Sequence, residues 1–324
     1  MKDFSIPPCI ISDIKKFEDV FKREITTNTT LLNIITSYIL KTKGKQLRPI
    51  LVFLSARMCG AITESTYSAA YMIELLHTAT LLHDDVVDNA EKRRGFFSIN
   101  ALWKNKIAVL VGDYFLAKGL LHAIEKHEIE ILGIISNAVK EMSEGELLQV
   151  EKSRKLNNTE EIYFEIIRKK TAALFVAAMT AGAVSSMQCN DEQKASIKKI
   201  AEILGVAFQI KDDILDYTST NIIGKPAWND LKEQKITLPL LHALSQVPKS
   251  EQRRIKHLLK KHKNKHGKLK EIVDFVTAFG GIEYAQQTID TMCKEAIELT
   301  SVFPQNESRD TMVELIQFVS TRIK

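Results

Sequence analysis

The sequence has few residues that break helices. Its 324 residues include 13 glycines and 7 prolines, which together are about half of the usual share. No proline lies between residues 50 and 225. A sheet protein of this length needs many tight turns, and such turns depend on glycine and proline. The scarcity argues against a β-rich fold and predicts an all-α fold.

Cysteine is also scarce, and a leader segment is not evident. The four cysteines, Cys9, Cys59, Cys189 and Cys293, form no C-x-x-C motif and no dense cluster. Such usage is typical of a reducing compartment, where buried free thiols are expected. The N-terminal residues MKDFSIPPCI lack the apolar core of a signal peptide. Together these features predict a cytoplasmic protein.

One stretch carries no charge over 20 residues: TAALFVAAMTAGAVSSMQCN, residues 171–190. Its length alone would allow it to span a membrane. Its many small and polar residues make it only weakly apolar, however, so a helix buried inside the protein is the preferred interpretation.

Positive charge is concentrated in one segment. The net charge is +5, but residues 249–270 hold ten Lys or Arg against one Glu, which leaves −4 for the rest of the chain. This segment has no aromatic residue to stack on bases, so a nucleic-acid partner is not expected. A solvated helix with its turn is expected instead, and contact with anionic membrane lipids is the alternative.

Long helical patterns separated by short polar breaks follow one another along the chain. The expected helices cover about 12–41, 46–59, 65–90, 98–123, 128–153, 159–188 and 191–218, followed by shorter ones. No flexible linker interrupts them, which predicts a single domain over residues 1–324. The helices at 65–90 and 191–218 are apolar nearly all round and are expected at the centre.

Both central helices end in the same acidic pattern. DDVVD contains Asp84, Asp85 and Asp88, and DDILD contains Asp212, Asp213 and Asp216 at identical spacing. In each case the apolar run precedes the acids, which places them at the C-terminal end of a buried helix, where the helix dipole is already negative. Two acidic helix ends facing solvent are the structural alternative. The repetition on two buried helices favours a shared chemical role.

Six carboxylates so placed need compensating cations. Ligands that are all oxygen atoms favour Mg²⁺, with Mn²⁺ as the alternative, over zinc. An EF-hand is excluded because neither motif has the alternating acids, central glycine and distal glutamate of that loop.

Magnesium held by carboxylates commonly shares its remaining positions with phosphate oxygens. Basic residues occur before, between and after the two acidic motifs in the sequence. They are Lys45 and Arg48 in GKQLRP, Arg93 and Arg94 after the first motif, Lys169 and Lys170, and Lys225 and Lys235 after the second. The arginine pair suits phosphate best because a guanidinium binds it in a bidentate manner.

These residues resemble a known family, the trans-isoprenyl (polyprenyl) diphosphate synthases. The matching segments occur in the family's order over most of the chain: GKQLRP at 44, ELLHTATLLHDDVVDNAEKRRG at 74, VGDYFLA at 111, GELLQ at 145, RKKTAALF at 168, GVAFQIKDDILDY at 205 and GKPAWNDLKEQKITLPLL at 224. Trp228 and Gln234 depart from it, because the family often has small residues such as glycine at these places.

The resemblance implies an isoprenoid synthase fold, a single-domain bundle of about ten or more helices around a central elongated cavity. It also implies a reaction: an allylic diphosphate ionises, and isopentenyl diphosphate attacks the resulting cation. A homodimer is implied as well. A peripheral membrane contact for release of the lipid product is a separate expectation.

The resemblance assigns roles to individual residues. Three Mg²⁺ ions would be bound by Asp84, Asp85, Asp88, Asp212 and Asp216, and Asp213 completes the second catalytic motif. The allylic diphosphate would contact Arg93, Lys170, Lys225 and Lys235, with Thr171 and Gln209 near the leaving oxygen. Isopentenyl diphosphate would contact Lys45, Arg48, His77 and Arg94.

Product length is predicted from the helix before the first motif. Ala79 and Thr80 lie about one helical turn before Asp84, with Leu76 a further turn away. In this family, bulky aromatics here tend to limit the product to short chains, so these small residues predict a long chain, hexaprenyl to octaprenyl. The alternative is that Ala79 only packs against a neighbouring helix.

Three other functions compete with this one. A short-chain synthase making farnesyl or geranylgeranyl diphosphate differs in product length only. A terpene cyclase usually lacks the second intact motif, and a non-catalytic subunit would be expected to have lost acidic or basic residues.

Overall fold

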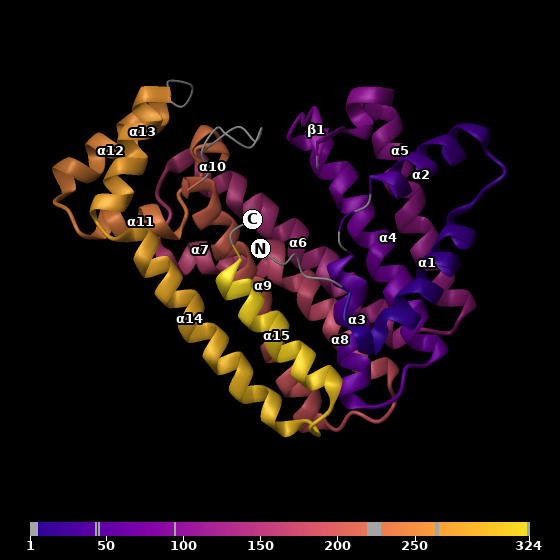
Figure 1. Ribbon diagram of the computed structural model, residues 1–324. Helices are drawn as coiled ribbons and strands as arrows, with labels where there is room; N and C mark the ends of the chain where they lie inside the picture. The colour runs from indigo at the N-terminus through magenta and orange to yellow at the C-terminus, as the bar shows by residue number, and fades with distance from the viewer. Residues whose placement is uncertain are drawn as a thin grey trace. The chain divides into compact units, whose positions relative to one another are not determined.

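A computed structural model of the chain describes residues 6–42, 44, 46–93, 95–218, 228–262 and 266–322. Helices dominate it, and in the described part of the chain the β structure is one hairpin, β1 (Lys92–Arg93) and β2 (Phe96–Phe97) (Figure 1). The all-α prediction is confirmed.

The helices follow one another with short connections. They are α1 (Ile11–Ile25), α2 (Thr30–Lys41), α3 (Leu47–Cys59), α4 (Glu64–Val87), α5 (Ile99–Glu125), α6 (Ile129–Lys155), α7 (Glu160–Ile167), α8 (Ala173–Ser185), α9 (Asp191–Thr218), α10 (Asn229–Lys232), α11 (Leu238–Ser245), α12 (Lys249–His262), α13 (His266–Ala278), α14 (Gly281–Leu299) and α15 (Glu307–Thr321). A 3-10 turn precedes α1, a second precedes α15, and a π-helical turn, Arg168–Ala172, joins α7 to α8.

The predicted helices match the observed ones within a few residues, with one exception. The single helix expected at 12–41 is wrong, because α1 and α2 are separated at residues 26–29. Thr26 and Thr29 have extended backbones, with ψ of 140° and 110°. The Asn33 side chain accepts a hydrogen bond from the Thr27 amide at 2.9 Å. Branched threonines and an asparagine that bonds locally compete with helix formation, which explains the break.

The chain divides into two compact units. Unit 1 consists of residues 1–139, 174–198 and 302–312, and unit 2 consists of residues 140–173, 199–301 and 313–324. The single-domain organisation and the central elongated cavity stay predictions.

In unit 1, α4 and α5 pack in antiparallel register. The His83 imidazole faces Asp113 at 3.4 Å, the Leu75 side chain reaches Gly119, and the Tyr71 ring lies 4.6 Å from the His122 ring. Because the two sequence numbers in each pair have a nearly constant sum, residues 115 and 116 lie opposite Ala79.

Also in unit 1, α3 and α8 run parallel and very close together. The Arg48 guanidinium lies 5.7 Å from the centre of the Phe175 ring near the start of both helices. At their far ends, the Cys189 and Cys59 sulfurs are 2.8 Å apart. All four cysteines are free thiols, with Cys59 and Cys293 buried and Cys9 and Cys189 half-buried. Between these ends Gly182 faces α3, and a Cβ atom there would lie 2.2 Å from the Val52 carbonyl oxygen.

The uncharged stretch at 171–190 is largely buried, as the sequence predicts. Of its residues, Phe175, Ala178, Met179 and Ala181 are wholly inaccessible to solvent. A different helix is long and apolar enough to cross a membrane: α5, in which 28% of the most apolar window is buried.

Unit 2 has a core of its own beneath the basic segment. Ile255 and Leu259 of α12 pack with Leu269 and Ile272 of α13 in one apolar cluster. Lysines and arginines occupy the outer faces of these two helices, where Arg254 forms ion pairs with Glu251 and Glu271. The helices α12 and α13 are therefore amphipathic, as expected for solvated helices.

Gly182→Ala should destabilise the protein, because its new methyl group would collide with the α3 backbone. We expect the free energy of unfolding in urea to fall by about 1–3 kcal/mol. Gly133→Ala is the matched control, since a Cβ atom there meets nothing within 4 Å in α6. That variant should gain up to about 1 kcal/mol from helix propensity. Equal effects at the two sites would contradict the close packing of α3 and α8.

Candidate functional site

The first acidic motif closes α4. Asp84 lies in its last turn and is half-buried, whereas Asp88 caps the helix and is exposed. Val86 and Val87 separate the acids, and their apolar side chains predict that both pack against the core. This prediction is wrong for Val87, which is 67% exposed. The carboxylates of Asp84 and Asp88 thus lie at least partly exposed at the C-terminal end of α4, as the sequence predicts.

Asp85 has a different environment. It is 3% exposed, and Arg93 on β1 holds its Oδ1 atom through Nε at 2.8 Å and through the terminal nitrogen at 2.7 Å. The Asn100 side chain donates a hydrogen bond to the Asp85 carbonyl oxygen at 3.2 Å. Arg93, predicted to contact phosphate, therefore ties the β1–β2 hairpin to the end of α4. The predicted metal role of Asp85 stays a prediction.

The residues before this motif line up along α4. His77, Leu76 and Ala79 are buried, with exposed fractions of 8%, 3% and 0%. Thr80 is half-buried and its hydroxyl donates to the His77 carbonyl oxygen at 2.9 Å.

The second motif closes α9 in unit 2, and its three acids have three different environments. Asp212 is exposed and forms an ion pair with Arg322, just after α15. Asp213 is 3% exposed and accepts hydrogen bonds from the Tyr163 hydroxyl at 2.6 Å and from Gln209 at 2.8 Å. Asp216 accepts the backbone N–H groups of Asn229 and Asp230 at 3.0 and 3.1 Å. Asp216 thereby anchors the start of α10.

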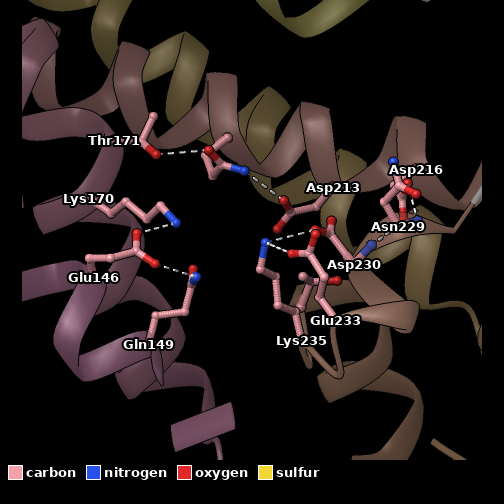
Figure 2. Close-up of polar contacts among 12 residues, drawn as sticks. Glu146, Gln149, Lys170, Thr171, Asp213, Asp216, Asn229, Asp230, Glu233 and Lys235 are labelled. Atoms are coloured by element: carbon pink, nitrogen blue, oxygen red, sulfur yellow. Dashed lines mark hydrogen bonds and ion pairs between the residues drawn. The ribbon is translucent and has the colours of Figure 1, made fainter. Parts of the chain in front are cut away.

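A cavity of about 220 Å³ lies beside this motif within unit 2. Its lining brings together five residues that the sequence singles out: Lys170, Thr171, Gln209, Asp213 and Lys235. The Thr171 hydroxyl donates to Gln209 at 2.8 Å, and Gln209 donates to Asp213, so a chain of hydrogen bonds crosses the site (Figure 2).

Lys170 and Lys235 reach the cavity from different segments. In Figure 2 both ammonium groups point into the space between them, Lys170 beside Glu146 and Lys235 beside Asp230 and Glu233. Each lysine is thus held by a carboxylate partner in a cavity whose other walls are partly apolar. An anion entering the cavity would meet two positive groups that are already oriented.

Lys170 is placed by an irregular turn. Residues 168–172 form a π-helical turn, a feature that occurs frequently at functional sites. The wider turn brings the backbone close to α6, where a Cβ atom on Gly145 would lie 2.7 Å from the Lys170 amide nitrogen. Gly145 belongs to the GELLQ segment, so its lack of a side chain makes room for the turn.

Burial raises the pKa values of the acids around the cavity. The pKa of Asp213 lies well above its ordinary value because of burial and the nearby Asp230 charge. Burial also raises the pKa of Asp230, against the opposing effect of Lys235. The same two causes, burial and Asp230, raise the pKa of Asp216 to about 6. These carboxylates repel one another in a site that a bound cation would stabilise.

The two departures from the family pattern share one backbone property. Trp228 and Gln234 have φ angles of 63° and 62°, in the left-handed region that favours glycine. Trp228 is 9% exposed and packs in the apolar cluster of unit 2. The Gln234 side chain donates to the Lys260 carbonyl oxygen at 3.0 Å. The left-handed backbone is thus accompanied by apolar packing at Trp228 and by a side-chain hydrogen bond at Gln234.

Three predicted substrate-binding residues, Lys45, Arg94 and Lys225, lie outside the described residues. Conversely, the sequence interpretation missed Tyr163, Glu146 and Arg322 as neighbours of the site. Glu146 lies in the recognised GELLQ segment, which was a usable signal. Tyr163 and Arg322 carry no local motif, and only the fold brings them to the second acidic motif.

The donor atoms fit a hard divalent cation. The exposed or half-buried members of the two motifs are Asp84, Asp88, Asp212 and Asp216, and they offer carboxylate oxygens, the ligand type that Mg²⁺ prefers. Among the residues that the structure describes, no three acidic, histidine or cysteine side chains form a complete metal site by themselves. Magnesium commonly completes its coordination with water and phosphate oxygens, which agrees with this arrangement.

The fold and the site define a class of protein: an all-helical protein with two acidic motifs at helix ends and two lysines that line a cavity beside the second motif. Comparison with known proteins identifies the family. The polyprenyl synthetase profile matches residues 29–276. The octaprenyl diphosphate synthase of Escherichia coli (strain K12) is 33% identical over 300 residues, which cover 92% of each chain.

Solved structures agree with this. A decaprenyl diphosphate synthase from Rhodobacter capsulatus has a TM-score of 0.91 and 31% identity, over 98% of both chains. A geranylgeranyl pyrophosphate synthase from Bacteroides thetaiotaomicron has a TM-score of 0.83 and 36% identity, again over 98% of both. The chain belongs to the polyprenyl synthetase family, and it is a prenyltransferase.

The stability of the metal-free protein should fall as pH rises from about 4 to about 6. The Asp216 carboxyl ionises near 3.8 when unfolded and at about 6 when folded. Between these values the folded chain binds more protons at Asp216, so raising the pH favours unfolding, and this one carboxyl contributes at most about 1.4 kcal/mol per pH unit. Urea unfolding in EDTA at several pH values measures this slope.

Asp216→Asn should reduce the slope, because the group that titrates is gone. Asp274→Asn, at an exposed position on α13, serves as the control and should leave the slope as in the wild type. An Asp216→Asn variant with the wild-type slope would contradict the raised pKa.

Proposed function

We propose that the enzyme condenses isopentenyl diphosphate with an allylic diphosphate and repeats the step to give a long-chain trans-polyprenyl diphosphate. The cavity of unit 2 carries this proposal, because it combines Lys170, Lys235, Thr171 and Gln209 beside an acidic motif. Two complete acidic motifs argue against a non-catalytic subunit and against a terpene cyclase.

Magnesium ions would be held by Asp84, Asp88 and Asp212, with Asp85 and Asp216 as the further predicted ligands, and the expected number is three. When bound, Mg²⁺ neutralises diphosphate charge and makes diphosphate a better leaving group. Mn²⁺ supplies the same chemistry with the same oxygen ligands.

Side chains around the cavity would stabilise charge, orient polar groups and exclude water. Lys170 and Lys235 stabilise the negative charge that develops on the departing diphosphate. Thr171 and Gln209 form a hydrogen-bonded pair that fixes the orientation of polar groups beside that charge. Ile166, Ile167 and Ile236 line the same cavity and exclude water that would quench an allylic cation.

Replacing Asp84 or Asp212 with Ala tests the role of the acidic motifs. Each variant should lower kcat for condensation by about 100-fold or more, because charge stabilisation at the leaving group is lost. The assay uses isopentenyl diphosphate, an allylic primer and saturating Mg²⁺. Asp19→Ala, at an exposed position on α1, is the control and should behave as wild type. Turnover near the wild-type rate in either motif variant would refute the proposed role.

A long product is supported by the relatives and by the α4–α5 pair. Curated relatives include octaprenyl and nonaprenyl diphosphate synthases at 33% identity. Ala79 is wholly buried on α4 opposite residues 115 and 116 of α5, and a larger side chain there would extend toward α5. We propose a hexaprenyl to octaprenyl product. A short product remains the second candidate, because a geranylgeranyl pyrophosphate synthase structure is 36% identical.

Ala79→Tyr should shorten the product, since its ring would occupy the space one helical turn from the first motif. One turn rises about 5.4 Å, close to one extended isoprene unit, so chains should lose one or more units. Ala79→Ser is the matched control and should keep the wild-type length. Chromatography of the reaction products with each allylic primer measures this. An unchanged distribution in Ala79→Tyr would show that Ala79 only packs in the core.

A homodimer is proposed from an apolar stripe on α5. Five side chains recur along one side of that helix with exposed fractions between 38% and 58%: Val109, Leu110, Leu120, Leu121 and Ile124. A stripe of this kind favours burial against another helix surface. A second copy of the chain supplies such a surface by symmetry. This pairing also accounts for the length and apolar character of α5 without a membrane.

We also propose that the enzyme is cytoplasmic and contacts a membrane surface when it releases its lipid product. The basic outer faces of α12 and α13 support this contact, because exposed lysines and arginines attract anionic headgroups.

A further inference from the structure

The last described residue of the chain, Arg322, reaches the second acidic motif. It follows α15 directly, and its backbone N–H donates to the Phe318 carbonyl oxygen at 2.9 Å, which continues the helical hydrogen bonding. Its side chain is only 9% exposed, unusual burial for an arginine. A buried guanidinium needs specific partners, and α9 provides them.

Arg322 makes three contacts with one turn of α9. Its terminal nitrogen forms an ion pair with Asp212 Oδ1 and donates to the Phe208 carbonyl oxygen at 3.1 Å. The guanidinium also lies 3.9 Å from the centre of the Phe208 ring. Phe208 and Asp212 are four residues apart, so carbonyl, ring and carboxylate form a single binding surface on α9.

The end of α15 is itself held in place by α14. The Ser320 hydroxyl donates to Asp290 at 2.6 Å, and the Gln286 amide donates to the Ser320 carbonyl oxygen at 3.3 Å and to Asp290 at 2.9 Å. Gln286 also accepts a hydrogen bond from Lys211, the neighbour of Asp212, at 2.7 Å. Arg322 is thus delivered to Asp212 from a fixed helix.

We propose that Arg322 is a positioning residue for Asp212: it fixes the rotamer of this carboxylate and offsets its charge at the C-terminal end of α9. The inference rests on the proposed function, in which Asp212 binds magnesium. Groups that hydrogen-bond to metal ligands orient them, and their loss typically lowers metal affinity 10- to 100-fold. Arg322, directly after α15, therefore supports the second acidic motif through Asp212.

The first test measures the magnesium dependence of condensation. Arg322→Gln should raise the Mg²⁺ concentration at half-maximal rate about 10-fold or more. Arg322→Lys should lie between this variant and the wild type, because an ammonium keeps the charge but cannot make all three contacts. Arg309→Gln is the matched control on α15, where Arg309 donates to the Phe303 carbonyl oxygen at 3.1 Å. It should leave the magnesium dependence unchanged.

The second test does not use activity. Thermal unfolding with Mg²⁺ and inorganic diphosphate should show a rise in Tm for the wild type that Arg322→Gln reduces at equal concentrations. In EDTA, a double-mutant cycle of Arg322→Gln and Asp212→Asn should be non-additive, with the double variant more stable than the sum of the two effects implies.

The outcomes separate this inference from the proposed function. A wild-type enzyme that condenses the substrates, together with an Arg322→Gln variant of identical magnesium dependence, would overturn the inference alone. Additive effects in the cycle would overturn the contact itself. A wild-type protein without condensation activity and without stabilisation by Mg²⁺ and diphosphate would overturn both. If Arg322→Gln does not fold, Arg322→Lys decides the question through the same measurements.

Discussion

Carboxylates at the C-terminal ends of buried helices are the constraint on which the rest of the site depends. Each acidic motif adds negative charge where the helix dipole is already negative. The structure compensates for some of these charges locally: Arg93 holds Asp85, Arg322 holds Asp212, and backbone N–H groups hold Asp216. Asp213 is instead sheltered by neutral donors, Tyr163 and Gln209.

Because their partners differ, the three acids of each motif have different roles. Asp85 and Asp213 are buried and bound by their own neighbours, so they hold a hairpin and a hydrogen-bond chain in place. Asp84, Asp88 and Asp212 are more exposed, and we propose that they offer oxygens to a cation. The three acids of each motif look equivalent in the sequence but differ in burial and in hydrogen-bond partners in the structure. The basic residues follow the same logic, since Lys170 and Lys235 have glutamate partners near the cavity that an entering diphosphate would have to outcompete.

Much of the fold follows from the sequence because its signals are local. Helix periodicity and the lack of proline placed most helices to within a few residues. The family resemblance grouped Lys170, Thr171, Gln209 and Lys235, which line one cavity. The break after α1 was missed because branched threonines have only a weak preference against helix. The exposure of Val87 was missed because periodicity cannot tell where a helix leaves the core. Tyr163 and Arg322 could not be found, since their partners are 50 and 110 residues away in the sequence.

The π-helical turn at 168–172 has a consequence for how the segment can change. An α-helix advances about 100° per residue, so the extra residue in the turn changes the direction in which Lys170 and Thr171 point relative to the residues of α7. With this change Lys170 and Thr171 line the same cavity as Ile166 and Ile167 of α7. The π-helical turn also requires a glycine at position 145 on α6, because a side chain there would collide with its backbone. The extra residue of the turn and Gly145 therefore depend on each other, because a change at either one alone would move Lys170 away from its place at the cavity.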